Sequence, residues 1–114
     1  MNFSFHGIGA LCATFAADDA ADGQVVKISD QATVAPCGNG DAFCGIVRSV
    51  AKDGTACSVQ LRGAAEVPYS GSAPTPGFAS LSADGSGGVK VDESGRTFLV
   101  LAVDTVNATA SILL

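Results

Sequence analysis

The chain has 114 residues, of which 47% are hydrophobic and only 15% charged. This balance is the reverse of that of a disordered chain, and the length suits one domain with its own core. The net charge is −5 and no basic stripe is present, which excludes nucleic-acid binding as a main function. No run approaches the ~20 apolar residues of a membrane-spanning helix, so we expect no membrane partner.

The first 22 residues differ from the rest, because they lack strong turn pairs and glycine-bounded alternation. We predict that residues 1–22 form an extended arm and that residues 23–114 form a single β-barrel-like domain. Residues 11–21 are the most helix-like segment, but acidic residues at their end oppose the helix dipole. Residues 3–17 are apolar, yet the first basic residue is Lys27, so we expect a non-secreted chain without a signal peptide.

Beyond residue 22, short apolar or alternating runs are separated by glycine, proline and aspartate. About nine runs at a spacing of 8–12 residues predict an all-β fold, either a small barrel or a sandwich. The predicted strands are 25–29, 33–36, 45–50, 57–62, 65–69, 78–82, 88–92, 97–103 and 109–114.

Local signals refine three of these elements. Residues 57–62 alternate strictly between apolar and polar side chains, which indicates a strand with one buried face and one solvent-exposed face. Pro68 cannot donate to a ladder, so its strand should lie at a sheet edge. Residues 98–103 are apolar on both faces, which predicts a central strand or a subunit contact. Residues 70–77 are rich in proline and glycine and should form an exposed loop.

The four cysteines are Cys12, Cys37, Cys44 and Cys57, and no two of them have the spacing of a zinc or redox motif. We expect four reduced, buried thiols that pack as small apolar side chains. A bridge between Cys37 and Cys44 is an alternative. A metal site formed by these thiols and His6 has no support from the ligand spacing, so we predict neither a metal nor a cofactor.

The sequence contains no combination of residues that is typical of a catalytic site. His6 is the single histidine, and the carboxylates cluster in turns, where they commonly cap backbone amides. We therefore predict no catalytic residue and no enzyme activity. A small hydrolase that uses His6 or a cysteine remains as an alternative.

Aromatic side chains are the remaining candidates for partner contact. Phe3 and Phe5 lie two residues apart and would point the same way in an extended arm. Such an arm could add a strand to a partner's sheet edge, or it could close over the chain's own barrel end. Our candidate partner-contact residues are Phe3, Phe5, Phe15 and Tyr69. Our candidate subunit-contact residues are Phe98, Val100 and Ile112.

The order of turns and strands resembles a known family. The resemblance is clearest at residues 40–47, Gly-Asp-Ala-Phe-Cys-Gly-Ile-Val, and it includes residues 22–29, 38–50, 59–63, 83–91 and 98–104. Over about residues 22–114 the chain resembles the small capsid cement, or head decoration, proteins of bacteriophages and prophages.

This resemblance implies a β-barrel-like protein that binds the major capsid protein on the outside of the phage head. It also implies a homotrimer, synthesis in the bacterial cytoplasm, residence in the virion, and neither enzyme activity nor a cofactor. The alternative is another virion component, of the tail or a fibre, with a receptor- or carbohydrate-binding face.

Overall fold

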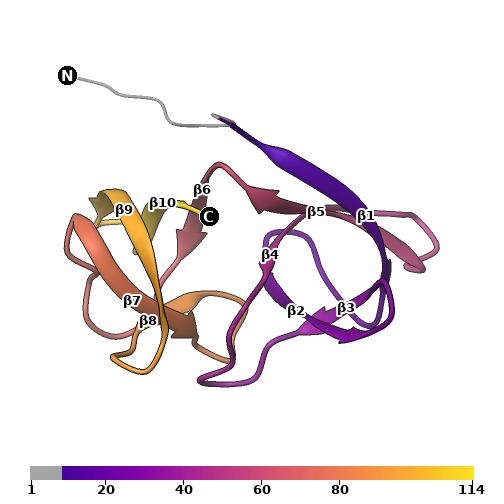
Figure 1. Cartoon of the computed structure of the whole chain (residues 1–114), viewed down its shortest axis with the longest axis horizontal. Helices are drawn as coiled ribbons and strands as arrows, with labels where there is room; N and C mark the ends of the chain where they lie inside the picture. Colours follow the sequence, from indigo (N-terminus) through magenta and orange to yellow (C-terminus); the bar gives the residue numbers. More distant parts are fainter. Residues whose placement is uncertain (1–8) are drawn as a thin grey trace.

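The computed structural model of the chain describes residues 9–114, which form ten strands and no helix (Figure 1). The all-β prediction is confirmed, and the nine predicted strands correspond to β2–β10. The strands are β1 (Leu11–Ala17), β2 (Val25–Asp30), β3 (Thr33–Pro36), β4 (Gly45–Val50), β5 (Ala56–Arg62), β6 (Ala64–Pro68), β7 (Gly77–Ala83), β8 (Val89–Val91), β9 (Arg96–Asp104) and β10 (Thr109–Leu113).

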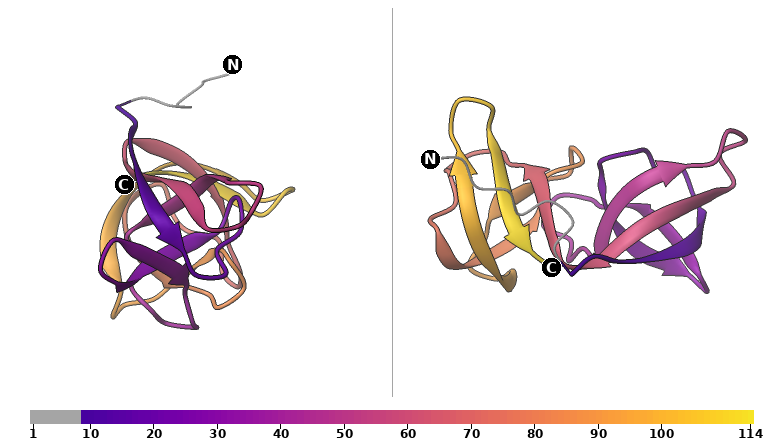
Figure 2. Two further views of the ribbon diagram at one scale, coloured as in Figure 1. Left: turned by 90° about the vertical axis from the view of Figure 1, so that its right-hand side faces the viewer. Right: turned by 90° about the horizontal axis from the view of Figure 1, so that it is seen from above.

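Two sheets lie side by side. The first five strands close into a barrel in the order β1-β3-β2-β4-β5, and the last five form a sheet in the order β6-β10-β9-β7-β8. Figure 1 shows the barrel on the right and the second sheet on the left, and the view from above in Figure 2 separates them in the same way. β6 is an edge strand, in agreement with Pro68, and β9 is the central strand of its sheet, as the apolar run predicts.

The predicted arm is wrong over the part that the structure describes, because Leu11–Ala17 is a barrel strand. β1 pairs antiparallel with β5, from Leu11 opposite Arg62 to Ala16 opposite Ala56, and parallel with β3. Without β1 the barrel would have an open edge between β3 and β5. The helical alternative fails for the same reason. The alternation is hard to see in the sequence, because β1 places small alanines on both of its faces.

The barrel interior is small and consists mainly of valines. Cys57 and Val59 of β5 are 3% and 0% exposed, and they pack with Val26, Val34 and Val47. The predicted alternation of buried and exposed side chains holds for residues 57–59, but it is wrong at the next two positions, where Gln60 is buried and Leu61 is half-buried. Phe15 of β1 packs against this cluster from the barrel wall.

A second, larger core joins the two halves of the chain. Its members from the first half are Val25, Cys37, Phe43 and Ile46, and they pack with residues of β6–β10. Among the latter are Phe98, Val100 and Ile112, which are 4%, 2% and 0% exposed. The prediction that these three form a subunit contact is wrong, since burial inside their own chain leaves no surface for a second one.

The connection between the two sheets is held by one buried polar side chain. Gln60 is 1% exposed, and its Nε2 donates to the carbonyls of Arg62 and Ala64, at 3.1 Å each. Gly63 between them has a φ of +99°, a conformation that favours glycine. Because a buried amide without partners is costly, these two bonds fix the path from β5 into β6.

Candidate partner-binding surface

The most exposed aromatic side chain among the described residues is Phe78, at the start of β7. Phe78 is 80% exposed, while Leu81 on the same strand is 1% exposed. The alternation of a strand directs Phe78 away from the core, since its neighbour Ala79 packs against that core. Phe78 shares a hollow with Val91, which is also exposed, and this grouping of exposed apolar side chains makes Phe78 a candidate contact for a partner.

A groove of about 580 Å³ runs beside Phe78. Ser72, Ala73 and Thr75 of the predicted exposed loop form one wall, and Val91 of β8 contributes a side chain that is 46% exposed. The sequence predicted the exposed loop 70–77, but it did not single out Phe78, the aromatic residue that borders the groove. The signal was present in the sequence as an aromatic residue directly after a proline- and glycine-rich loop.

The loop beside the groove is anchored at its start. Ser70 donates its backbone N–H to the carbonyl of Val89 at 2.9 Å, and its hydroxyl to Oδ2 of Asp84 at 2.6 Å. Tyr69 forms a parallel bridge with Val89. These contacts tie the end of β6 to the β7–β8 hairpin, so the groove begins at a defined position.

Asp84 stabilises that hairpin as well. Its Oδ1 accepts from the N–H groups of Ser86 and Gly88, at 2.6 Å and 3.1 Å. Burial raises the pKa of Asp84, but the hydrogen bonds from Ser70, Ser86 and Gly88 outweigh it, and the pKa is lowered overall. The carboxylate is therefore charged at neutral pH and engaged in fixing the turn.

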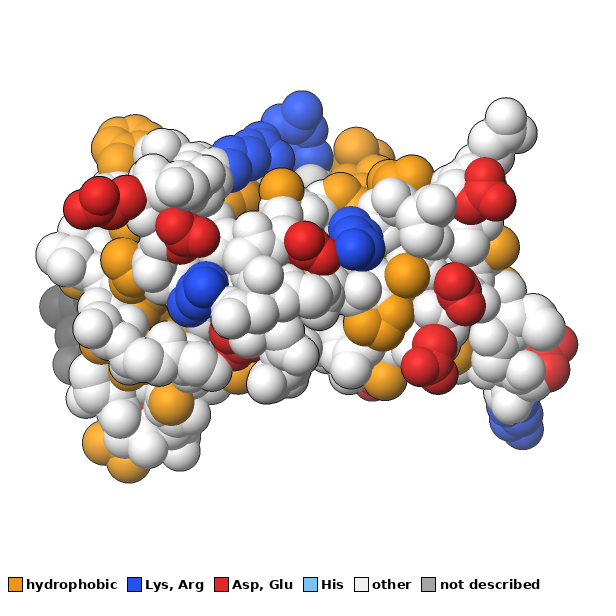
Figure 3. Space-filling model, turned by 90° about the horizontal axis from the view of Figure 1, so that it is seen from below, with side chains coloured by type: hydrophobic (Ala, Val, Ile, Leu, Met, Phe, Trp, Pro, Cys, Tyr) orange, Lys and Arg blue, Asp and Glu red, His pale blue; other side chains and the backbone are white. Residues whose placement is uncertain are grey.

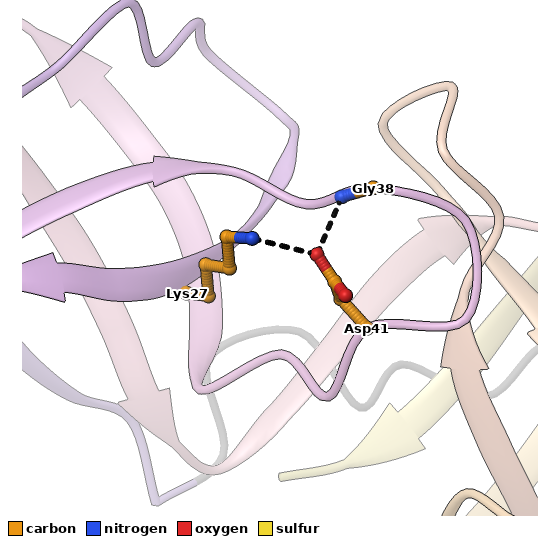
Figure 4. Close-up of polar contacts among 3 residues, drawn as sticks. All are labelled: Lys27, Gly38 and Asp41. Carbon is orange, nitrogen blue, oxygen red and sulfur yellow. Dashed lines mark hydrogen bonds and ion pairs between the residues drawn. The ribbon is translucent and has the colours of Figure 1, made fainter.

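A second hollow, of about 490 Å³, lies between the two halves of the chain and contains an ion pair. Nζ of Lys27 lies 2.7 Å from Oδ2 of Asp41, which also accepts from the N–H of Gly38 at 2.8 Å (Figure 4). The hydrogen bond and charge of Asp41 raise the pKa of Lys27, and the reciprocal bond with Lys27, helped by Gly38, lowers the pKa of Asp41. The ion pair joins Lys27 of β2 to Asp41 in the loop after β3 and helps to hold that loop in place.

The carboxylates of the turns cap backbone amides, as the sequence indicated. Asp53 accepts from the N–H of Thr55, Asp92 from that of Ser94, and Asp104 from those of two residues in the β9–β10 turn. Within residues 9–114, no group of three or more His, Cys, Asp or Glu side chains is arranged to hold a metal ion.

The remaining predicted contact residues have other positions. Phe15 and Tyr69 are half-buried and pack against the barrel core and the larger core. Phe3, Phe5 and His6 lie outside the described residues. Both rings are therefore partly occupied by contacts within their own chain, and their contact with a partner stays a prediction.

The cysteines are free thiols, and the Cys37–Cys44 bridge is not formed. Cys37 and Cys57 are buried as expected, whereas Cys44 is half-buried and Cys12 is exposed on β1. Burial raises the pKa of Cys37 to about 11.

Surface charge is dispersed. On the face shown in Figure 3, acidic and basic side chains are both scattered over the two halves of the molecule, and the basic ones form no continuous stripe. Among the described residues, no helix is long and apolar enough to cross a membrane.

No family model matches the chain, and no curated protein matches it.

Proposed function

We propose that the chain is a bacteriophage capsid decoration protein, which binds the outside of the assembled head through the major capsid protein and stabilises the shell. The observation that carries the proposal is Phe78, exposed at 80% beside a groove formed with the loop 70–77. The resemblance over residues 22–114 supplies the partner, and the all-β fold is compatible with it.

The physical basis is contact by a few anchored side chains. An aromatic ring contributes most to the binding free energy when it moves from water into a pocket of the partner. Such rings dominate the binding free energy of many interfaces. Phe78 lies on a strand of a sheet, so little backbone conformational entropy is lost when the ring docks. A protein that binds the assembled lattice more tightly than free subunits stabilises the lattice by mass action.

The oligomer that we propose is a homotrimer, which follows from the resemblance. Light scattering coupled to size exclusion measures the solution mass directly. A mass of three chains supports this part of the proposal. A single-chain mass at every concentration tested would contradict a trimer in solution.

Cosedimentation tests the main proposal. The purified chain is mixed with assembled heads of the phage that encodes it, and in parallel with unassembled major capsid protein. We expect the chain to pellet with heads and to leave the unassembled subunits unbound. The variant Phe78→Ser should lose most of this binding, whereas Val106→Ser should retain it. Val106 is a matched control, because it is 90% exposed but lies in the distant β9–β10 turn.

The groove also suits a second candidate, a tail or fibre component that binds carbohydrate. Thr75, Ser80 and Glu93 line the groove and could hydrogen-bond to sugar hydroxyls, while the ring of Phe78 offers an apolar platform. Binding to surface glycans of the host bacterium that disappears in Phe78→Ser, without binding to heads, would favour this candidate and overturn the decoration proposal.

A further inference from the structure

One pair of neighbouring residues in the connection from β3 to β4 is chemically labile. Asn39 is the only asparagine of the chain that is followed by glycine. A glycine has no side chain to shield its backbone nitrogen, so this nitrogen can attack the amide of the preceding asparagine, and asparagine is one of the heat-labile residues of proteins. Asn39 is exposed, and no hydrogen bond with a described residue holds its side chain. Its amide is therefore accessible.

The turn that contains this pair favours a glycine at its second position. Gly40 has a φ of +87°, a conformation in which a side chain is strained. Oδ2 of Asp41 accepts from the N–H of Gly38 at 2.8 Å (Figure 4). The N–H of Asp41 donates to the carbonyl of Gly38 at 3.1 Å. The shape of the turn thus explains why a reactive glycine follows Asn39.

The same turn is joined to the second sheet through Ala83, the last residue of β7. The N–H of Gly40, which is the group that would attack Asn39, donates to the carbonyl of Ala83 at 2.8 Å. The N–H of Ala83 donates in return to the carbonyl of Asp41 at 2.9 Å. Ala83 is 0% exposed. Because these bonds hold the nitrogen of Gly40 in place, it cannot turn toward the side chain of Asn39 while the contact is closed.

The turn between β7 and β8 packs directly on Asn39. A Cβ added to Gly85 would lie 3.0 Å from the backbone nitrogen of Asn39 and 3.2 Å from its Cα and Cβ. Asn39 also lines a hollow of about 400 Å³ together with Ser70 and Asp84. Both members of the reactive pair therefore contact the second half of the chain, and the reaction requires these contacts to open.

We propose that Asn39 is a latent modification site, which deamidates only when the contact of residues 38–41 with Ala83 and Gly85 opens, and whose product prevents the contact from forming again. The nitrogen of Gly40 bonds to Cγ of Asn39, and the amide nitrogen leaves as ammonia with the proton of Gly40. Water then opens the succinimide. Opening at the main-chain carbonyl gives isoaspartate, and opening at Cγ gives aspartate. This inference does not depend on the proposed function.

The two products differ in the backbone and not in charge. Isoaspartate adds one methylene to the backbone before Gly40, which moves the N–H of Gly40 relative to Ala83. The pair of hydrogen bonds at Ala83 can then no longer be made with the native geometry. Aspartate carries the same carboxylate but leaves the backbone unchanged. A comparison of the two products therefore separates the effect of the longer backbone from that of the added charge.

Peptide mapping by mass spectrometry measures how fast Asn39 is converted in the full chain, either folded in buffer or unfolded in urea. We expect conversion to be at least about tenfold slower in the folded chain, which corresponds to about 1.4 kcal/mol. Gly85→Ala should raise the rate in the folded chain severalfold, because the added Cβ presses on Asn39.

Gly54→Ala is the matched control for this variant. Gly54 also follows an aspartate in a turn and has a φ of +74°, so the backbone strain is similar, but nothing lies within 4 Å of the added Cβ. It should leave the rate at Asn39 unchanged. Circular dichroism establishes that both variants are folded. Equal rates in the folded and unfolded wild type, or equal rates in the two folded variants, would overturn the proposal.

The isoaspartate form, isolated by chromatography, tests the second part of the proposal. Its Tm should be roughly 4–8 °C lower than that of the wild type, and amide exchange at Gly40 should be faster. Asn39→Asp should keep a Tm near that of the wild type and slow exchange at Gly40, because its backbone is unchanged. An isoaspartate form that is as stable as Asn39→Asp would refute the claim that the product blocks the contact.

Discussion

The ring of Phe43 stacks on the ring of Phe98, with centroids 4.9 Å apart and planes inclined by 8°. Phe43 lies in the connection from β3 to β4, and Phe98 lies in the central strand of the second sheet. The guanidinium carbon of Arg96 lies 5.2 Å from the centroid of the Phe98 ring. This stack belongs to the core that packs both halves of the chain together.

The stack makes the two halves of the chain depend on each other. Phe43→Ala should lower the free energy of unfolding by about 3–5 kcal/mol, because it removes a buried ring and leaves a cavity. Urea denaturation followed by circular dichroism measures the change. Phe78→Ala is the matched control, and its exposure should keep its effect within about 0.5 kcal/mol. Equal effects of the two variants would contradict a shared core around Phe43.

Acid should destabilise the fold through its turn carboxylates. Hydrogen bonds to the charged form lower the pKa values of Asp41, Asp53, Asp92 and Asp104 from 3.8. The unfolded chain therefore binds protons more readily than the folded chain, and stability rises with pH in this range. The stabilisation should be complete above about pH 5 and should be lost as the pH falls through the folded pKa values.

Scanning calorimetry between pH 7 and pH 3 measures this dependence. Asp53→Asn keeps an acceptor for the N–H of Thr55 but cannot titrate, so its acid-induced fall in Tm should be smaller than that of the wild type. A Tm that stays constant down to pH 3 in the wild type would contradict the role of these carboxylates.

A strained alanine in the β9–β10 turn offers a stabilising change. Ala108 has a φ of +53°, where an L side chain costs about 1–2 kcal/mol relative to glycine. Ala108→Gly should raise the free energy of unfolding by up to about 1 kcal/mol, since the flexibility of glycine in the unfolded chain offsets part of the gain. Ala102→Gly, on the exposed side of β9, should lower it by about 0.5–1 kcal/mol. Chemical denaturation distinguishes the two, and a loss of stability in Ala108→Gly would refute the strain argument.

The thiols should differ sharply in reactivity. Cys12 is exposed, whereas Cys37 is buried with a pKa raised to about 11, and burial also raises the pKa values of Cys44 and Cys57. Because the thiolate is the reactive form, an aromatic disulfide reagent at pH 7.5 should modify one thiol rapidly. That rapid phase should be missing in Cys12→Ser, and all four thiols should react in denaturant. Rapid modification of Cys37 in the folded chain would show that its burial is not maintained.

Local patterns were sufficient to predict most of the strands. Val25–Asp30, Thr33–Pro36 and Gly45–Val50 were predicted to within one residue at each end, because turn residues bound each run and β-branched side chains fill it. The edge position of β6 followed from Pro68 alone. β1 was not predicted, because alanines occupy both faces of the strand and the sequence therefore shows no clear alternation of hydrophobicity. In addition, its pairing with β5 is a long-range contact.

The candidate surface was predicted only in part. The loop 70–77 was identified from its composition, since proline and glycine keep a chain out of regular structure. Sequence could not separate Phe98, which is buried, from Phe78, which is exposed, since both lie in apolar strands. Their positions depend on which face of the sheet meets the core, and only the packing of the second half against Phe43 and Ile46 decides that.

The sequence by itself determined the all-β class, the turns and the capping role of the aspartates, because these depend on residues close together in the chain. Only the tertiary structure decided that β1 closes the barrel, that Phe98, Val100 and Ile112 are core, and that Phe78 and Leu113 face outward. The physical reason is that strand pairing and burial join residues far apart in the chain. A period of two defines the two faces of a strand, but it does not say which of them will meet another sheet.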